Sequence, residues 1–435
     1  MVVTRARAVI LVGNPARPYS RAIRIGRTLV DLGYDVEIAA TTEPGAPLEE
    51  RDGALVIRRY PPTGRLAGLA ATHGRRLSAE SSAARPNPSK VVRVWRTQRA
   101  RVIEWWLWPQ TMRGWWATLA RDLAPADLYH ACGTLPIAAA LAARARDRRA
   151  GRSSKVILDV IDITLESNNV DHIPGPIRRL LARRERGWAR AADAVTAIND
   201  AFADRAVMHW DLARRPAVVP NYPAPVGPGQ FVEPHPDRIR AATGLPPETR
   251  ICLFWGRLGP YVGLDEAAEA VLLIPDAALV LLGFGRGWEA SVARDNDPRY
   301  AGRHFTLPSV HPDELASWVA SADIALCTLP PLSYNQRYTT PNKFLEAMAA
   351  GTPIVLGPDL PVMMEILRRE DLGRVAASMR PADIAAAIGK ILDLPSEERA
   401  AWRERIRVVA RENYSWPIAA ATYRELVTSL GTPGP

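Results

Sequence analysis

A lysine and a glutamate three residues apart, Lys343 and Glu346, are the residues whose types and spacing best fit a ligand site. Lys343 lies beside the predicted start of a helix, and Glu346 lies just over one turn further in. Unpaired backbone amides and the positive end of the helix dipole point out of such a start. They can bind a phosphate group while a nearby carboxylate accepts hydrogen bonds from sugar hydroxyls. The pattern therefore predicts a binding site for a nucleotide-sugar.

Both ends of that helix are marked in the sequence. Thr340 is of a residue type that caps helix N-termini, and Pro341 suits the first helical position because its missing N–H would be unpaired there anyway. Gly351 supplies a left-handed stop. The segment Ile354–Leu356 then predicts a short buried strand behind the helix.

Two glycine-containing segments follow predicted strands in the same half of the chain. Gly256-Arg257-Leu258-Gly259 comes after the predicted strand Arg250–Trp255, and Gly283-Phe284-Gly285 comes after the predicted strand Ala278–Leu282. Backbone amides in such loops can approach an anion closely, and an arginine can bind phosphate oxygens through two hydrogen bonds. Each segment alone is better explained as a structural turn, so the ligand hypothesis depends on their combination.

These segments share one feature, which is that each directly follows a predicted strand. Gly13 and Asn14 follow the predicted strand Ala8–Val12, just as the glycine loops and the helix start follow theirs. In open α/β sheets the carboxyl ends of parallel strands form the edge that binds ligands. Two such sheets facing each other would place Gly13 and Asn14 opposite Arg257 and Glu346.

Strands and helices alternate along both halves of the chain, which is the pattern of doubly wound parallel α/β domains. The other predicted strands are Val36–Ala40, Leu128–His130, Lys155–Val160, Ala194–Ile198 and Ile324–Thr328. Seven prolines between Pro216 and Pro236 indicate a stiff linker. We therefore expect one domain over residues 1–222 and a second over residues 223–412.

Length and composition are those of a globular protein. A chain of 435 residues, 47% hydrophobic and 23% charged, is long enough for two or three cores. No apolar run approaches a membrane-spanning helix, and the N-terminus enters a strand pattern without a secretory signal. The three cysteines are widely spaced and odd in number, so we expect neither a disulfide framework nor a metal site, and a cytoplasmic location.

Most of the net charge of +10 falls in one stretch, Arg65–Arg121, where eleven basic residues stand against Glu80 and Glu104. Six of the thirteen tryptophans share this stretch. Arginine with tryptophan is typical of a surface that meets anionic lipid headgroups. The same composition also fits core-packed helices with a solvated arginine face. Nucleic-acid binding is the weakest interpretation, because no recognised binding module accompanies the charge.

Taken together, the motifs resemble those of the retaining family 4 glycosyltransferases, which have the GT-B fold of two Rossmann-like domains facing across a cleft. The resemblance covers nearly the whole chain and is strongest over residues 341–353. It is also carried by residues 256–265, 281–285, 313–324, 192–198 and 218–221. Residues 414–416 resemble the start of the closing helix, which in that fold returns to the first domain, here as residues 413–431.

The resemblance implies roles for individual residues. Glu346 would hold the donor ribose, Arg257 would bind the departing β-phosphate, and Gly13 with Asn14 would lie beside the transferred sugar. The backbone amides around Pro341 to Lys343, at the helix start, would bind the diphosphate. The complete predicted set of donor-binding residues would be Gly13, Asn14, Gly256, Arg257, Gly283, Gly285, Tyr338, Thr340, Pro341, Asn342, Lys343 and Glu346. No metal or other cofactor is expected, because basic side chains and a helix dipole stabilise the departing charge.

The chain departs from the family pattern at three positions. Tyr338 stands where the first glutamate of a paired-glutamate motif is usual, and Val262 stands where a lysine is usual before Gly263. Ile161 replaces a histidine in an Asp-x-His-Asp run, which leaves Asp162 as the candidate for orienting acceptor or sugar. The predicted catalytic residues are therefore Asp162, Arg257 and Glu346.

The expected function is transfer of a sugar from a nucleoside-diphosphate sugar to a hydroxyl acceptor, with retention at the anomeric carbon. The acceptor is expected to be lipid-linked or a cell-surface glycan precursor, met at the inner face of the membrane through the basic, tryptophan-rich stretch. Two alternatives stay open at this point. Val262 and Ile161 motivate a catalytically silent binding protein of the same fold, and a nucleotide-sugar epimerase would use the same donor without an acceptor.

Overall fold

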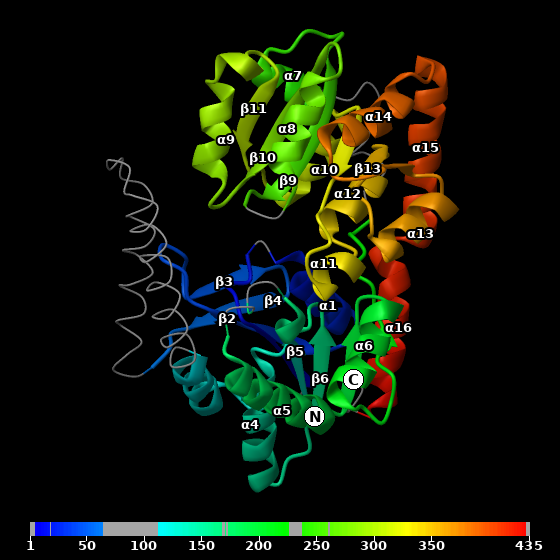
Figure 1. The fold of residues 1–435 in the computed structure, drawn as a ribbon. Coiled ribbons are helices and arrows are strands. Elements are labelled where there is room, and N and C mark those ends of the chain that lie inside the picture. Colours follow the sequence, from blue (N-terminus) through cyan, green and yellow to red (C-terminus); the bar gives the residue numbers. More distant parts are fainter. Residues whose placement is uncertain are drawn as a thin grey trace.

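The computed structural model describes residues 5–17, 19–63, 112–167, 170, 173–225, 237–259 and 262–431. Two sheets, each covered by helices, lie one above the other (Figure 1). The first sheet has the strand order β3-β4-β2-β1-β5-β6-β7-β8, and every pair is parallel except β3–β4. Its strands are β1 Arg7–Val12, β2 Asp35–Thr41, β3 Glu49–Asp52, β4 Leu55–Tyr60, β5 Leu128–Cys132, β6 Lys155–Val160, β7 Ala194–Ala197 and β8 Ala217–Val218.

Side chains alternate between the two faces of this sheet. In β1, Val9 and Leu11 pack in one core, and Ala8, Ile10 and Val12 pack in the other, as a period of two requires. The helices of this unit are α1 Ser20–Asp31, a helix over residues 112–122, α4 Ile137–Arg149, η1 Thr164–Glu166, α5 Gly175–Ala191, α6 Asp200–Trp210 and the C-terminal α16 Trp416–Ser429.

The second sheet has the order β11-β10-β9-β12-β13-β14 and is parallel throughout. Its strands are β9 Arg250–Arg257, β10 Ala277–Phe284, β11 His304–Pro308, β12 Ile324–Cys327, β13 Ile354–Leu356 and β14 Gly373–Val375. Its helices are α7 Arg238–Thr243, α8 Leu264–Leu272, α9 Trp288–Asp295, η3 Pro298–Tyr300, α10 Pro312–Ala320, α11 Tyr334–Tyr338, α12 Asn342–Ala350, α13 Pro361–Arg369, α14 Pro381–Leu392 and α15 Ser396–Asn413. The two parallel sheets confirm the predicted fold class.

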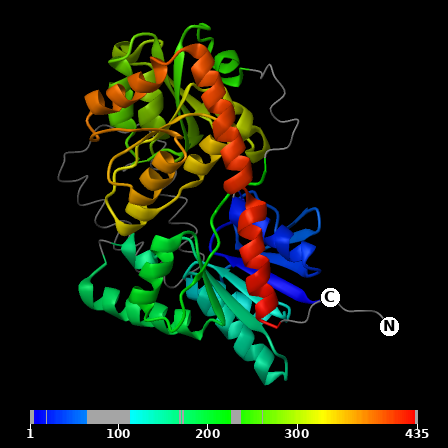
Figure 2. The same ribbon diagram turned by 90° about the vertical axis from the view of Figure 1, so that its right-hand side faces the viewer.

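The chain passes between the two units twice. The first crossing follows β8, and the second lies between α15 and α16, where the backbone N–H of Trp416 donates to the carbonyl of Pro223 on the first crossing (2.8 Å). Beyond this point α16 runs along the first unit, as Figure 2 shows in red. Its Trp416 indole donates to Thr28 Oγ1 of α1 (3.0 Å), and its Tyr423 hydroxyl lies 3.0 Å from His130 Nδ1. The predicted boundary at residue 222 stays a prediction, because residues 226–236 lie outside the described part.

The basic, tryptophan-rich stretch is described only from residue 112 onward. There Trp115 is fully buried, and the Trp116 indole donates to the carbonyl of Leu135 (2.9 Å). These two tryptophans therefore pack into the protein, as the core-packing interpretation expects. Residues 64–111 lie outside the described residues, so membrane docking stays a prediction. Within the described part, no helix is long and apolar enough to cross a membrane.

The start of the predicted ligand-binding helix is wrong by one residue. Helix α12 begins at Asn342, and Pro341, with ψ of 154°, occupies the N-cap position that the sequence assigned to Thr340. Thr340 is buried, and no side chain caps the helix from the N-cap position. Extended backbone at Pro341 explains the shift, because a helix cannot include a residue with that ψ. The other end is confirmed, with Gly351 left-handed at φ of 70°.

Candidate functional site

The glycine loops bring the ends of β9 and β10 into close contact. Gly283 pairs with Gly256, and a Cβ added at Gly283 would lie 2.1 Å from the Gly256 carbonyl oxygen. Gly285 has φ of +118°, and a Cβ there would lie 2.7 Å from the Leu258 carbonyl oxygen. Side chains would therefore clash at both positions. The loops meet the requirements of a structural turn, and whether they also approach a ligand stays a prediction.

Glu346 faces β9 from the second turn of α12. Its Oε2 accepts a hydrogen bond from the indole N–H of Trp255 (2.7 Å), and Trp255 is itself buried. Burial raises the pKa of the Glu346 carboxyl, while Trp255, Arg24 and Lys343 oppose that rise. Within the described residues the carboxylate is thus held by one donor, and its other oxygen can accept from a further donor.

Lys343 adopts a position that the sequence does not indicate. Its ammonium lies 3.4 Å from the centre of the Phe254 ring, a cation–π contact with a buried side chain of β9. Loss of water lowers the pKa of Lys343 to about 8, although Cys327 and Glu346 favour the charged form. Lys343 and Glu346 therefore occupy one partly dehydrated site at the start of α12.

Three other predicted site residues of the second unit have different surroundings. Arg257 ends β9 with an exposed side chain. Asn342 begins α12, and its Oδ1 accepts a hydrogen bond from Asn221 Nδ2 of the first crossing (2.5 Å). Tyr338 ends α11. Its ring stacks on that of Tyr334, with the ring centres 4.4 Å apart, and it packs against the core of the first unit. These contacts give Tyr338 a role in joining the two units.

Further contacts join α11 to the first unit. Asn335 Oδ1 accepts from the backbone N–H of Ile163 (3.2 Å), and its Nδ2 donates to the Ile163 carbonyl (3.0 Å). Asn199 Nδ2 donates to the carbonyl of Tyr338 (2.9 Å). The loop that carries Asp162 is thereby held against the second unit.

The predicted site residues of the first unit are Gly13, Asn14 and Asp162, and each follows the end of a strand. Asn14 Oδ1 accepts from the Ala16 N–H (2.9 Å), and the Asn14 carbonyl accepts from the Thr41 N–H (3.0 Å), so the loop is fixed in place. A Cβ added at Gly13 would lie 3.3 Å from the side chain of Leu135. Asp162 is exposed, yet partial loss of water raises the pKa of its carboxyl.

A buried polar cluster lies under this edge of the first sheet. Both oxygens of Asp159 accept hydrogen bonds from Arg21 at 2.7 Å, and Thr196 Oγ1 donates to one of them (2.7 Å). His130 and Cys132 lie close enough to Asp159 to form a metal-ligand set. The guanidinium of Arg21 already neutralises that carboxylate, so the cluster fits a buried ion pair.

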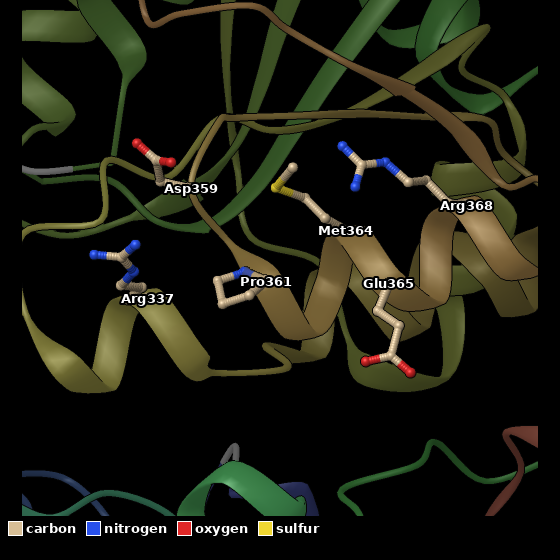
Figure 3. Close-up of a pocket in the computed structure, with 6 residues that line it drawn as sticks. All are labelled: Arg337, Asp359, Pro361, Met364, Glu365 and Arg368. Carbon is tan, nitrogen blue, oxygen red and sulfur yellow. The ribbon is translucent and has the colours of Figure 1, made fainter.

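One cavity of about 390 Å³ opens beside α11 and α13 (Figure 3). It is lined by Arg337, Asp359, Pro361, Met364, Glu365 and Arg368. In Figure 3 the Glu365 side chain points away from Arg337, and Met364 lies between Arg337 and Arg368. None of its lining residues belongs to the predicted donor set, although Arg337 directly precedes Tyr338.

Two Rossmann-like units with this order of strands define the GT-B fold, and solved structures agree. Sucrose-phosphate synthase of Thermosynechococcus elongatus superposes with a TM-score of 0.68 at 17% identity, over 98% of this chain and 99% of that one. WaaG, a glycosyltransferase of lipopolysaccharide biosynthesis, gives 0.62 at 15% identity, over 96% and 99%. HepE of Anabaena, solved with UDP-glucose, gives 0.62 at 13% identity, over 97% and 99%.

The match to a family model falls in the second unit, whereas the alignments with individual relatives extend further along the chain. Residues 249–394 match the family described as Glycosyl transferases group 1. D-inositol 3-phosphate glycosyltransferase of Streptomyces scabiei is 26% identical over 60% of this chain and 58% of its own length. The enzyme of the same name from Mycolicibacterium gilvum is 32% identical over 35% of this chain and 34% of its own. The chain thus aligns with 34–58% of the length of these relatives.

Sequence reasoning missed two residues that surround Glu346. Trp255 lies near the end of an apolar strand and looks like an ordinary core residue, and nothing in its neighbours indicates an indole bonded to a carboxylate 91 positions away. Arg24 lies in α1 of the first unit and acts electrostatically on Glu346. Its position between two isoleucines, on a helix whose first half also carries Arg21, is a weak signal that a charge is needed there.

Proposed function

We propose that this chain is a glycosyltransferase that moves a sugar from a nucleoside-diphosphate sugar to a hydroxyl acceptor, with retention at the anomeric carbon. The observation that carries the proposal is the Glu346 carboxylate, held by Trp255 at 2.7 Å beside the start of α12. It lies within the region that matches the group 1 glycosyltransferases, residues 249–394. HepE, a structural neighbour, was solved with UDP-glucose, which supports a donor of this chemical class.

In this proposal the second unit binds the donor. The free amides at the start of α12 and the exposed Arg257 would neutralise the diphosphate, and Glu346 would accept hydrogen bonds from ribose hydroxyls through its second oxygen. Lys343 would add positive charge close to the same helix start. Because these groups supply the charge that stabilises the departing nucleotide, we propose that transfer needs no metal ion.

The first unit would bind the acceptor and the transferred sugar. Asp162, in the loop held by Asn335, would orient a hydroxyl, and Gly13 with Asn14 would lie beside the sugar. The relatives are named for D-inositol 3-phosphate, so a phosphorylated polyol is the first acceptor to test. A lipid-linked acceptor is the second, since the arginine- and tryptophan-rich stretch belongs to the first half of the chain.

A thermal-shift screen of nucleotide-sugars tests the donor. A donor present at about 100 times its dissociation constant stabilises the native state by about 2.7 kcal/mol. We expect at least one member of a UDP-, GDP- and ADP-sugar panel to raise the melting temperature. Glu346→Ala should abolish that rise, whereas the exposed-site variant Glu365→Ala should keep it. A panel that leaves the wild-type protein unshifted contradicts the proposal.

Product analysis then tests transfer. With inositol phosphate or a lipid-linked sugar as acceptor, we expect a glycoside whose anomeric configuration, measured by proton NMR, matches that of the donor. The rate should be unchanged by EDTA. Conversion of the donor sugar without an acceptor would instead identify an epimerase. Donor binding without hydrolysis or transfer to any acceptor would identify the silent binding protein.

A further inference from the structure

Arg24, on α1 of the first unit, is a buried cation. Its side chain is only 9% exposed, and its Nε has no hydrogen-bond partner among the described residues. Its Nη2 donates to Asn221 Oδ1 at 2.6 Å. Burial and the neighbouring Arg21 lower the pKa of Arg24 to about 10, so the side chain remains charged at neutral pH. A buried charge destabilises a fold unless its surroundings compensate it, and those surroundings belong to both units.

Arg24 lies where the two chain crossings meet. Its guanidinium carbon is 5.4 Å from the ring centre of Trp416, the first residue of α16 on the second crossing. Trp416 is bonded through its backbone N–H to Pro223 of the first crossing, which also carries Asn221. One side chain of the first unit thus contacts both segments that connect it to the second.

From this point a short chain of bonds reaches the donor helix. Asn221 accepts from Arg24 and donates from Nδ2 to Asn342 Oδ1, at 2.5 Å. Asn342 is the first residue of α12, and Glu346 follows one turn later. Arg24 and Glu346 also attract each other, because each favours the charged form of the other.

We propose that Arg24 is a positioning residue of the donor site: it holds the start of α12 from the first unit, through Asn221, and presents a fixed positive charge to Glu346. The inference rests on the proposed function for the identity of the ligand. The mechanical coupling between Arg24 and α12 exists in the free protein and is testable without any ligand.

The first experiment uses the ligand-free, full-length protein. Arg24→Gln removes the charge and the bond to Asn221, and Asn221→Ala breaks the same chain one step later. Hydrogen exchange in peptides covering residues 342–351 should become faster in both variants. The matched control is Arg27→Gln, since Arg27 lies one turn further along α1 and, within the described residues, pairs with Asp52 at the surface (3.1 Å). Unchanged exchange in Arg24→Gln, or equal acceleration in Arg27→Gln, overturns the proposal.

The second experiment measures the affinity for UDP by calorimetry. We expect about a tenfold loss in Arg24→Gln, which is the effect of one charge-assisted hydrogen bond. Arg24→Lys keeps the charge and should recover most of it. The double variant Arg24→Gln/Asn221→Ala should lose no more UDP affinity than Arg24→Gln alone, because each substitution breaks the same chain of hydrogen bonds. Additive losses overturn the proposal.

The pH profile separates positioning from a general loss of structure. Lys343 on the same helix, Trp255 on β9 and Cys327 on β12 are the other groups that act on Glu346 or its neighbour. Without Arg24, the acid side of the UDP-binding profile should move to higher pH, and Arg24→Lys should restore it. An unmoved profile contradicts the charge role. If the wild-type protein binds no nucleotide, the proposed function fails, and hydrogen exchange still decides the role of Arg24.

Discussion

Replacing Trp255 by phenylalanine isolates the bond that holds Glu346. The substitution keeps an aromatic ring on β9 and removes the indole N–H that donates a hydrogen bond to Glu346 Oε2 (2.7 Å). A hydrogen bond to a charged group contributes about 1.5–3 kcal/mol to stability, and one to a neutral group about 0.5–1.5 kcal/mol. The bond from Trp255 should therefore contribute more to stability when Glu346 is ionised than when it is protonated. The free energy lost in Trp255→Phe should accordingly depend on pH.

The matched control is Trp318→Phe. Trp318 packs against the same core, but its indole N–H is buried without a hydrogen-bond partner in the described part of the chain. Both variants lose the same ring volume, so the difference between them reports the bond to Glu346 and cancels much of the packing cost. We expect Trp255→Phe to lose about 2 kcal/mol more than Trp318→Phe near pH 8.

The sign of the pH dependence follows from the raised pKa of Glu346. Burial favours the protonated form in the native state, so the carboxyl ionises there only as the pH rises above its ordinary range. Trp255 stabilises the ionised form, and its contribution is present above the native pKa and lost as the pH falls through it. The excess cost of Trp255→Phe should therefore shrink to about 1 kcal/mol or less as the pH falls through the native pKa of Glu346. Urea unfolding followed by far-UV circular dichroism measures both values, and an excess that is absent or independent of pH refutes the reasoning.

Three further predictions concern the same two units. Because the pKa of Lys343 is about 8, UDP affinity should fall between pH 7 and 9, and Lys343→Arg should abolish that fall in calorimetry. Gly283→Ala should destabilise the protein by more than about 2 kcal/mol because its Cβ would meet a carbonyl oxygen at 2.1 Å, whereas Gly259→Ala, with open space around it, should melt close to the wild type. Asp159→Asn should cost about 3–5 kcal/mol, since it leaves buried Arg21 uncompensated, and urea unfolding should show a smaller loss when Arg21→Met is added.

The parallel sheets were predictable because apolar strands and capped helices carry local signals. The structure confirms the predicted bounds of Lys155–Val160 and Ile354–Leu356 without change. Five strands were missed, namely β3, β4, β8, β11 and β14. Glu49–Asp52 is charged throughout, and β8 and β14 have only two and three residues, so these three carry no period that differs from a loop. Leu55–Tyr60 of β4 does contain an apolar run and was missed despite that signal.

The surroundings of Glu346 were predictable only in part. The helix start and its lysine are neighbours in sequence, so spacing alone places them together. Trp255 and Arg24 come from β9 and α1, and their approach depends on how two sheets and two crossings pack. The fold-level resemblance places the two units face to face, yet it carries no information on a tryptophan or an arginine that is particular to this chain.

The contacts between the units converge on a single short segment. Asn335 bonds to Ile163, the Tyr338 carbonyl to Asn199, and Asn342 to Asn221, so α11 and the start of α12 are held from the first unit at each end. A segment fixed at both ends cannot move independently of the surface that fixes it. The position of Glu346 then depends on the first unit as well as on Trp255 of the second. Donor affinity and acceptor alignment would accordingly change together in variants of this segment, because the same bonds place both.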